Sequence, residues 1–185
     1  MNKAGTQRIE TDRLILRRFV ADDASEMYQN WASDPEVTRF LTWPTHTGVD
    51  VSRSVVNNWI SRYDDGAFFN WAIVWKETGS VIGNISVVHL NEDIGEAEIG
   101  YCMSRDLWGR GIMPEALIAV ERYLFETVGV DRISARHDTN NPKSGRVMEK
   151  AGMKQEGSMR RAGKNNQGIC DVTLYAILRN DWVQK

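Results

Sequence analysis

The sequence predicts an α+β fold of mixed α/β layers, in which helices pack on a central sheet. Three observations predict this class. Residues 68–90 contain two strand-like runs joined by "KETGS", where Gly79 can adopt the positive φ of a hairpin turn. Residues 112–128 carry one apolar stripe at helical spacing. From that strand-rich middle onwards, the predicted order is strand, helix, strand, helix and a final pair of strands.

The elements of the first half follow from local patterns. Residues 13–19, "RLILRRF", alternate apolar and basic side chains, as expected of a half-buried strand. Helical spacing of apolar residues predicts helices over 21–32 and 49–63. Between them, residues 34–46 are predicted to form a short helix that runs into an irregular loop.

The second half begins with a strand over 96–104, which has Ala97, Ile99, Tyr101 and Met103 on one face. The long helix is predicted to begin near Ile112, because Pro114 is tolerated only in a first turn. Gly129 is predicted to end it. The remaining elements are a strand, a short helix and a late hairpin of two strands, at 132–137, 141–152, 153–163 and 170–178.

Composition limits the function classes. The chain has 185 residues, 42% hydrophobic and 26% charged, and we expect residues 1–185 to form one domain. A net charge of −2 argues against binding to nucleic acid or to a membrane surface. No apolar run has the length of a membrane span or a signal core, so a cytoplasmic location is expected. Two cysteines and three scattered histidines predict neither a disulfide framework nor a metal site.

The stretch "RDLWGRGIMPEAL", residues 105–117, carries the first functional signal. Gly109 and Gly111 precede the long helix, and glycine lets a ligand approach the backbone closely. The unpaired N–H groups of a first helical turn favour an anion, and Arg110 adds a positive charge. The stretch lacks the lysine and hydroxyl pair of an NTP-binding loop and the G-x-G-x-x-G of a dinucleotide fold. By itself it is compatible with a phosphate-type ligand or with a plain tight turn.

A second segment, "DTNNPKSGRVMEKAGMKQEG" from Asp138 to Gly157, opens a helix after a strand. In this order, the two segments resemble the GNAT superfamily of acyl-CoA-dependent N-acetyltransferases, and most of all its RimJ/RimL-type branch, which acetylates protein N-termini. The family's Q/R-x-x-G-x-G/A pattern is matched by Trp108-x-x-Gly111-x-Met113, with Trp108 in place of the polar first residue and Met113 in place of the small last one. The resemblance extends from "IETDRLILRRF" to "DVTLYAILRNDW", nearly the whole chain.

The resemblance implies a twisted, mostly antiparallel central sheet, flanked by helices and splayed between two parallel strands, 96–104 and 132–137. It also implies acetyl-CoA as co-substrate, with the pyrophosphate in the glycine loop and the pantetheine arm in the gap between these strands. Asn141 would hydrogen-bond the pantetheine amides. The implied acetyl-CoA-binding residues are Tyr101, Cys102, Met103, Trp108, Gly109, Arg110, Gly111, Ile112, Met113, Pro114, Asn141 and Ser144.

Amide formation requires a neutral amine and a proton for the departing thiolate. Glu98 is the candidate base, acting through a water, and its alternative is a solvated or salt-bridged strand carboxylate. Ser144 is the candidate acid near the thioester sulfur, and its alternative is a helix-capping hydroxyl. No adjacent histidine or lysine marks Cys102 as an activated thiolate, so we interpret it as a small buried hydrophobe rather than an acyl carrier.

These residues together predict an acetyl-CoA-dependent N-acetyltransferase that acts by direct attack in a ternary complex. The predicted acceptor is a protein or peptide N-terminal α-amine; the alternatives are a small-molecule amine, or a non-catalytic acyl-CoA-binding sensor. Residues 40–48 and 160–171 are expected to govern acceptor choice, with Asp171 and Tyr175 as weaker candidates for substrate contact. His46 is interpreted as a surface-loop residue. The sequence leaves the oligomeric state open between monomer and homodimer.

Overall fold

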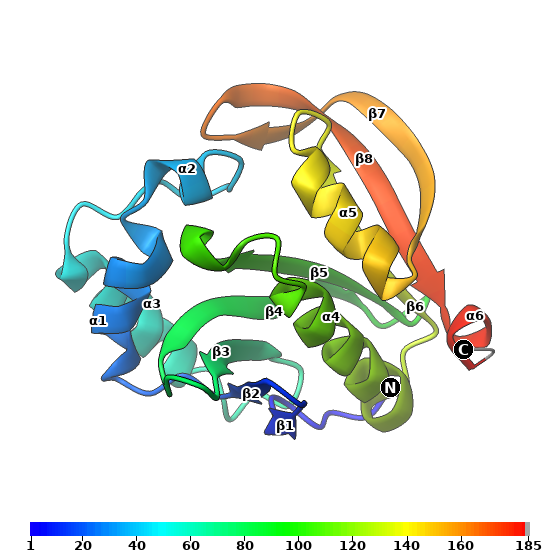
Figure 1. Ribbon diagram of the computed structural model, residues 1–185. Coiled ribbons are helices and arrows are strands. Elements are labelled where there is room, and N and C mark those ends of the chain that lie inside the picture. Colours follow the sequence, from blue (N-terminus) through cyan, green and yellow to red (C-terminus); the bar gives the residue numbers. More distant parts are fainter. Residues whose placement is uncertain (184–185) are drawn as a thin grey trace.

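The strands of the computed structural model, which describes residues 1–183, form one sheet in the order β1-β2-β3-β4-β5-β6-β8-β7 (Figure 1). Neighbouring strands are antiparallel, except that β5 and β6 run parallel. This confirms the predicted mostly antiparallel sheet. The strands are β1 (Ile9–Glu10), β2 (Leu14–Arg17), β3 (Asn70–Trp75), β4 (Val81–Asn91), β5 (Glu96–Met103), β6 (Arg132–Asp138), β7 (Lys154–Asn165) and β8 (Gly168–Leu178).

The two parallel strands part from each other along their length. β5 and β6 pair only over Glu96–Glu98 and Arg132–Ser134. Beyond this stretch β5 continues beside β4 as far as Met103, and β6 continues beside β8 as far as Asp138. The strands therefore keep different partners, and their C-terminal ends diverge. The predicted splay between the parallel strands is confirmed.

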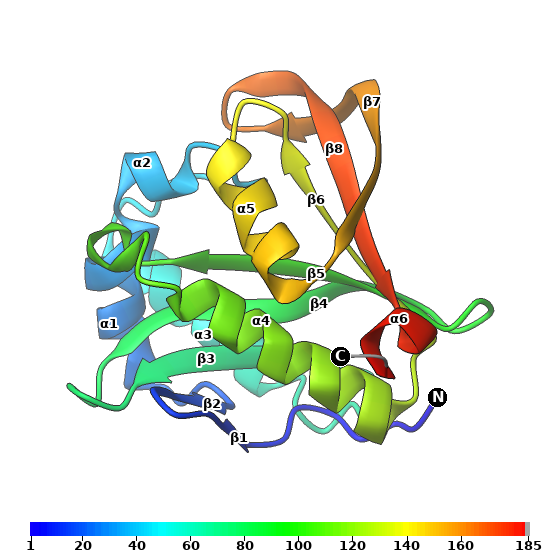
Figure 2. The ribbon, with the colours of Figure 1, turned by 45° about the vertical axis from the view of Figure 1, so that its right-hand side comes forward.

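Helices cover both faces of the sheet (Figure 2). One core joins the sheet to α4 and α5 and includes Trp71, Ile99 and Leu117. A second core joins it to α1 and α3 and includes Val56 and Cys102. Side chains of a strand alternate between the faces, so odd-numbered residues of β5 point to the first core and even-numbered residues point to the second. The helices are α1 (Asp23–Met27), α2 (Pro35–Thr38), α3 (Val49–Ile60), α4 (Ile112–Tyr123), α5 (Pro142–Ala151) and α6 (Arg179–Val183), with short π- or 3₁₀-helical turns η1 (Tyr28–Ala32), η2 (Arg105–Leu107) and η3 (Leu124–Val128).

The ends of the long helix agree with the sequence prediction. α4 begins at Ile112, with Pro114 in its first turn, and the chain leaves the helical path at Gly129, whose φ is 85°. Its last turn, η3, is π-helical, which the apolar spacing does not distinguish from an α-helix. β1 and α6 are absent from the prediction because elements of two and five residues carry no measurable periodicity. None of the helices within residues 1–183 has the length and apolar character that a membrane span requires.

Candidate active site

A groove of about 830 Å³ lies where β5 and β6 part. The end of β5, α2 with the residues after it, the segment before α4, and α5 line it. Figures 1 and 2 show where these elements lie in the fold. Of the site residues predicted from the sequence, Glu98 and Arg110 do not line it. The predicted residues that do line it are Tyr101, Cys102, Met103, Trp108, Gly109, Gly111, Ile112, Met113, Pro114, Asn141 and Ser144.

The start of α4 presents backbone donors to this groove. Gly109 and Gly111 have φ values of 80° and 74°, in the left-handed region that favours glycine. The first hydrogen bond of the helix runs from the N–H of Glu115 to the carbonyl of Gly111, and no side chain caps the helix. The preceding N–H groups have no partner within the helix, and a helix N-terminus of this kind favours an anion.

A brace from the turn between β1 and β2 holds this glycine turn, and sequence reasoning missed it. Arg13 Nη1 donates to the carbonyl of Arg110 at 3.0 Å, and Arg13 Nε donates to Glu115 at 2.6 Å. Thr11 donates to the other carboxylate oxygen of Glu115 at 2.6 Å. Burial raises the pKa of Glu115, but hydrogen bonds from Thr11 and Arg13 outweigh burial and leave that pKa below its ordinary value. The brace therefore keeps a negative charge in place and orients the glycine turn.

The side chain of Arg110 points away from the groove. Its guanidinium lies 5.9 Å from the ring centroid of Trp75. Trp108, by contrast, lines the groove, and its indole N–H donates to the carbonyl of Met103 at 3.1 Å. The indole therefore ties the loop before α4 to the end of β5.

Three cations on α5 also line the groove, and the sequence prediction did not include them. Lys143, Arg146 and Lys150 are exposed and recur at i, i+3 and i+7, which places them along one side of the helix. Lys143 Nζ lies 5.0 Å from the ring centroid of Trp108, on the opposite wall. The spacing in "PKSGRVMEK" was visible, but only the fold shows that this side of the helix faces the groove.

Ser144 and Tyr101 meet across the gap. The Tyr101 hydroxyl donates to the Ser144 carbonyl at 3.0 Å and lies 3.1 Å from Ser144 Oγ. Burial raises the pKa of Tyr101 well above its ordinary value, so this phenol keeps its proton. The pair connects β5 to the first turn of α5.

Glu98 lies near the point where the strands part, but it is paired. Its Oε1 is 2.8 Å from Nε of Arg136 on β6, and its side chain is 17% exposed. The arrangement agrees with the salt-bridged alternative, and the role of Glu98 as a base stays a prediction.

Cys102 is buried, as interpreted from the sequence, and its Sγ donates to Asn84 Oδ1 at 3.0 Å. Burial raises the pKa of its thiol to about 12, so almost no thiolate exists near neutral pH. Cys102→Ala is therefore expected to keep acetyl transfer within about threefold of the parent. Thiol-release kinetics check this. An acetyl group found on Cys102 by mass spectrometry after incubation with acetyl-CoA alone would contradict it.

The two segments predicted to govern acceptor choice touch each other. Asn166, in the turn of the β7–β8 hairpin, donates from its side-chain amide to the carbonyls of Thr38 and Trp43, each at 2.8 Å. Its backbone N–H donates to the carbonyl of Leu41 at 3.2 Å. Leu41 and the neighbouring hairpin residue Gln167 both line the groove. The hairpin turn and the loop after α2 thus form one continuous edge of the groove.

Three other residues that the sequence analysis considered near the acceptor serve the fold. The surface-loop interpretation of His46 is wrong: the residue is 7% exposed, its Nδ1 lies 2.7 Å from Ser52 Oγ, and burial lowers its pKa. The Asp171 carboxylate accepts the backbone N–H of Arg161 at 2.7 Å within the irregular part of the hairpin. Tyr175 is buried and donates to Glu149 at 3.0 Å. None of these three lines the groove.

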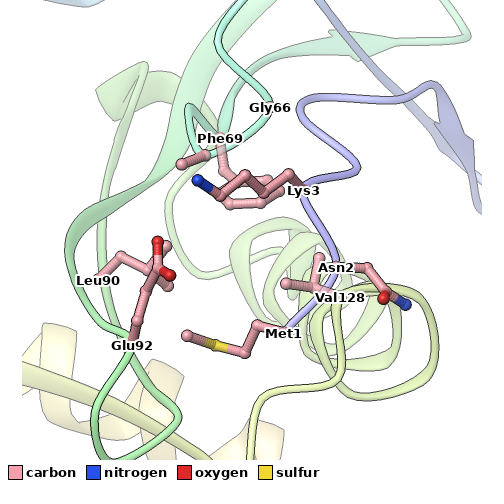
Figure 3. A pocket seen from close by; sticks show the side chains of 9 residues that line it. Met1, Asn2, Lys3, Gly66, Phe69, Leu90, Glu92 and Val128 are labelled. Carbon is pink, nitrogen blue, oxygen red and sulfur yellow. The ribbon is translucent and has the colours of Figure 1, made fainter.

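A second hollow lies beside the N-terminus, between Lys3, Phe69 and Glu92 (Figure 3). Its volume of about 10 Å³ matches a single water, so it holds no substrate. Within residues 1–183, no three His, Cys, Asp or Glu side chains gather as a metal site requires. The groove is therefore the candidate active site.

Comparison with known proteins agrees with this geometry. The acetyltransferase (GNAT) domain family matches residues 13–154. The uncharacterized N-acetyltransferase p20 of Bacillus licheniformis is 30% identical over 176 residues, 95% of this chain and 98% of p20. The ribosomal protein uS5-alanine N-acetyltransferase of Escherichia coli is 26% identical over 184 residues, 95% of this chain and 92% of that enzyme. The solved structure of a GNAT-family acetyltransferase from Bacillus anthracis has a TM-score of 0.83 at 25% identity, over 94% of this chain and 99% of that one.

Fold and groove thus define an enzyme that transfers an acyl group from coenzyme A. The chain belongs to the GNAT family of N-acetyltransferases, and acetyl-CoA is its acetyl donor.

Proposed function

We propose that the protein acetylates the N-terminal α-amine of a peptide or protein, by direct attack of that amine in a ternary complex. The observation that carries the proposal is that one groove extends from the start of α4 to Leu41 and Gln167 at the hairpin turn. One groove thereby offers room for a cofactor arm and for an acceptor chain. Similarity to a ribosomal protein-alanine N-acetyltransferase supports the peptide acceptor.

The residues around the groove fit coenzyme A. The uncapped first turn of α4 would hold the pyrophosphate, because its N–H groups and the helix dipole favour an anion. The cations Lys143, Arg146 and Lys150 would face the phosphates from the other wall. Acetyl-CoA supplies the acetyl group as a thioester, and the backbone of Tyr101 to Met103 together with Asn141 would hold its pantetheine arm.

Side chains and backbone groups of this chain would donate the proton that the leaving group needs and stabilise the developing charge. Ser144 would give a proton to the departing sulfur, and Tyr101 would hold the Ser144 hydroxyl in place through the hydrogen bond between them. Backbone N–H groups of β5 would stabilise the charge that develops on the acetyl oxygen. Glu98 is the base that the sequence predicts, but its carboxylate is paired with Arg136.

Amine chemistry favours an N-terminus over a lysine side chain. An α-amine has a pKa of about 8 and lysine of about 10.4, so near pH 7.5 roughly a quarter of α-amines are neutral, against about 0.1% of lysines. Less proton removal is therefore needed before attack.

Thiol release from acetyl-CoA, measured with a panel of amines, tests the proposal. We expect release with short peptides that have free N-termini and none with the same peptides blocked at the N-terminus. Polyamines, aminoglycosides and free amino acids complete the panel. Activity confined to these small amines would refute the peptide acceptor while leaving the acetyltransferase assignment in place. Binding of acetyl-CoA without release for any amine would indicate the non-catalytic sensor.

A further inference from the structure

Asp138 is a buried carboxylate in the wall of the groove. It is the last residue of β6, its exposure is 7%, and it lines the groove. The preceding residue, His137, faces α5, because its ring closely approaches Gly145 of that helix. Asp138 therefore points to the opposite face of the sheet, the face to which Cys102 also points.

Within residues 1–183, no cation neutralises this carboxylate. Oδ1 accepts the backbone N–H of Asn140 at 2.8 Å, and Oδ2 accepts the side-chain amide of Asn165 at 2.7 Å. Both donors are neutral, and so is the Cys170 thiol, which also hydrogen-bonds this carboxylate. The ion pairs within residues 1–183 do not include Asp138. Asp23, which is also buried, is by contrast paired with Arg17 at 2.7 Å.

A buried charge without a counter-ion is costly, and it stabilises any cation that reaches it. The field of Asp138 already acts on its neighbour in β8: burial first, and then the Asp138 charge, raises the pKa of the Cys170 thiol. The remaining charged residues of the groove lie on other elements: Glu36 and Arg39 with α2, and Lys143, Arg146 and Lys150 on α5. The cations of α5 suit phosphates, and Glu36 is paired with Arg39 at 3.9 Å. The Asp138 carboxylate is therefore the one available to an ammonium.

We propose that Asp138 binds the ammonium group of the acceptor and takes its proton. This rests on the proposed acetyltransferase function, but not on which amine is the acceptor. Glu98, the base predicted from the sequence, is already occupied by Arg136, whereas Asp138 lines the groove with two neutral hydrogen bonds that hold its carboxylate in place.

Each proton that leaves the reacting nitrogen has an acceptor in this step. The ammonium gives one proton to Asp138 and becomes a neutral amine. The amine nitrogen then forms a bond to the acetyl carbon, while the bond between that carbon and sulfur breaks and its electron pair stays on sulfur. The second proton of the nitrogen ends on sulfur through the Ser144 hydroxyl, which gives one proton and receives another. Asp138 releases its proton to solvent before the next turnover.

The test compares three variants with the amine that the parent acetylates fastest in the panel. In Asp138→Asn, kcat/KM for the amine should fall roughly 100-fold near pH 7, since general base catalysis contributes at least that much. The loss should shrink as the pH rises past the pKa of the amine, while acetyl-CoA affinity stays unchanged. Asn165→Ala keeps the carboxylate and removes one of its hydrogen bonds, together with the bond that Asn165 accepts from the Gln167 N–H inside the hairpin turn, so it should lose far less. Glu98→Gln should show no such recovery at high pH.

Equal losses in Asp138→Asn and Asn165→Ala would reduce Asp138 to a structural role and overturn the proposal. High-pH recovery in Glu98→Gln alone would do the same and confirm the sequence prediction. A parent protein inactive with every amine would instead refute the proposed function itself.

A measurement on the parent protein covers the case in which Asp138→Asn does not fold. Peptide analogues with a dimethylated N-terminal nitrogen carry an ammonium, whereas analogues without the nitrogen do not. The charged analogue should inhibit about tenfold more strongly if a buried carboxylate receives it. Equal inhibition by the two analogues would overturn the proposal.

Discussion

Replacement of Gly111 by tryptophan is expected to lower acetyl-CoA affinity about 100-fold or more. Gly111 precedes the first turn of α4 and lines the groove, and a Cβ there meets only Arg13 Nη2, at 3.7 Å. An indole would therefore occupy the space in front of the uncapped N–H groups. Hydrogen bonds to a charged phosphate contribute roughly 1.5–3 kcal/mol each, so the loss of two accounts for the expected change. Isothermal titration calorimetry with acetyl-CoA measures it.

Two control variants separate this effect from backbone strain and from charge. Gly79→Trp places the same side chain at the same φ of 74° in the distant β3–β4 turn, where nothing lies within 4 Å of the new Cβ. Both tryptophans strain a left-handed backbone by about 1–2 kcal/mol, but Gly79→Trp should bind acetyl-CoA normally. Arg110→Ala should weaken binding only modestly, because that side chain lies over Trp75. Unchanged affinity in Gly111→Trp would show that this turn does not hold the cofactor.

Local rules were sufficient for much of the fold. The start of α4 was predictable because a proline is tolerated only in the first turn of a helix, and Ile112 is the resulting first residue. The β3–β4 hairpin was predictable because Gly79 supplies the positive φ of its turn. The faces of β5 follow from strict alternation, which places Ile99 in one core and Cys102 in the other.

Contacts between distant segments were not predictable in this way. The brace from Arg13 to Glu115 joins residues 102 positions apart, and Asn166 reaches Thr38 across 128 positions. Neither contact leaves a periodic signal in the sequence. His46 was misjudged for the same reason, because its burial depends on Ser52 of α3 and on the packing of a loop without regular structure.

The catalytic base could not be chosen from sequence patterns alone. Strand alternation places Glu98 on the same face of β5 as Cys102. Its partner Arg136, however, comes from the neighbouring parallel strand, and this pairing depends on the register of the two strands. Asp138 belongs to a segment that the sequence already singled out. Its burial without a cation, which is the reason to consider it, is a property of the folded chain alone.

The cations of α5 lead to a second large expected effect. In the triple variant Lys143→Gln, Arg146→Gln and Lys150→Gln, acetyl-CoA affinity should fall roughly 100-fold, because each charge near a phosphate contributes about 1 kcal/mol at a partly screened surface. All three side chains line the groove, and within residues 1–183 none is paired with a carboxylate. Calorimetry at two salt concentrations measures both the affinity and its salt dependence.

The salt dependence distinguishes phosphate binding by α5 from a loss of structure. Affinity of the parent should fall as ionic strength rises, whereas affinity of the triple variant should be lower but nearly independent of salt. Arg122→Gln, Arg160→Gln and Lys164→Gln together remove the same charge from exposed positions outside the groove. That control should keep both the affinity and the salt dependence of the parent. If the two triple variants lose affinity equally, net charge rather than the α5 cations attracts the cofactor, and the coenzyme phosphates must lie elsewhere on the protein.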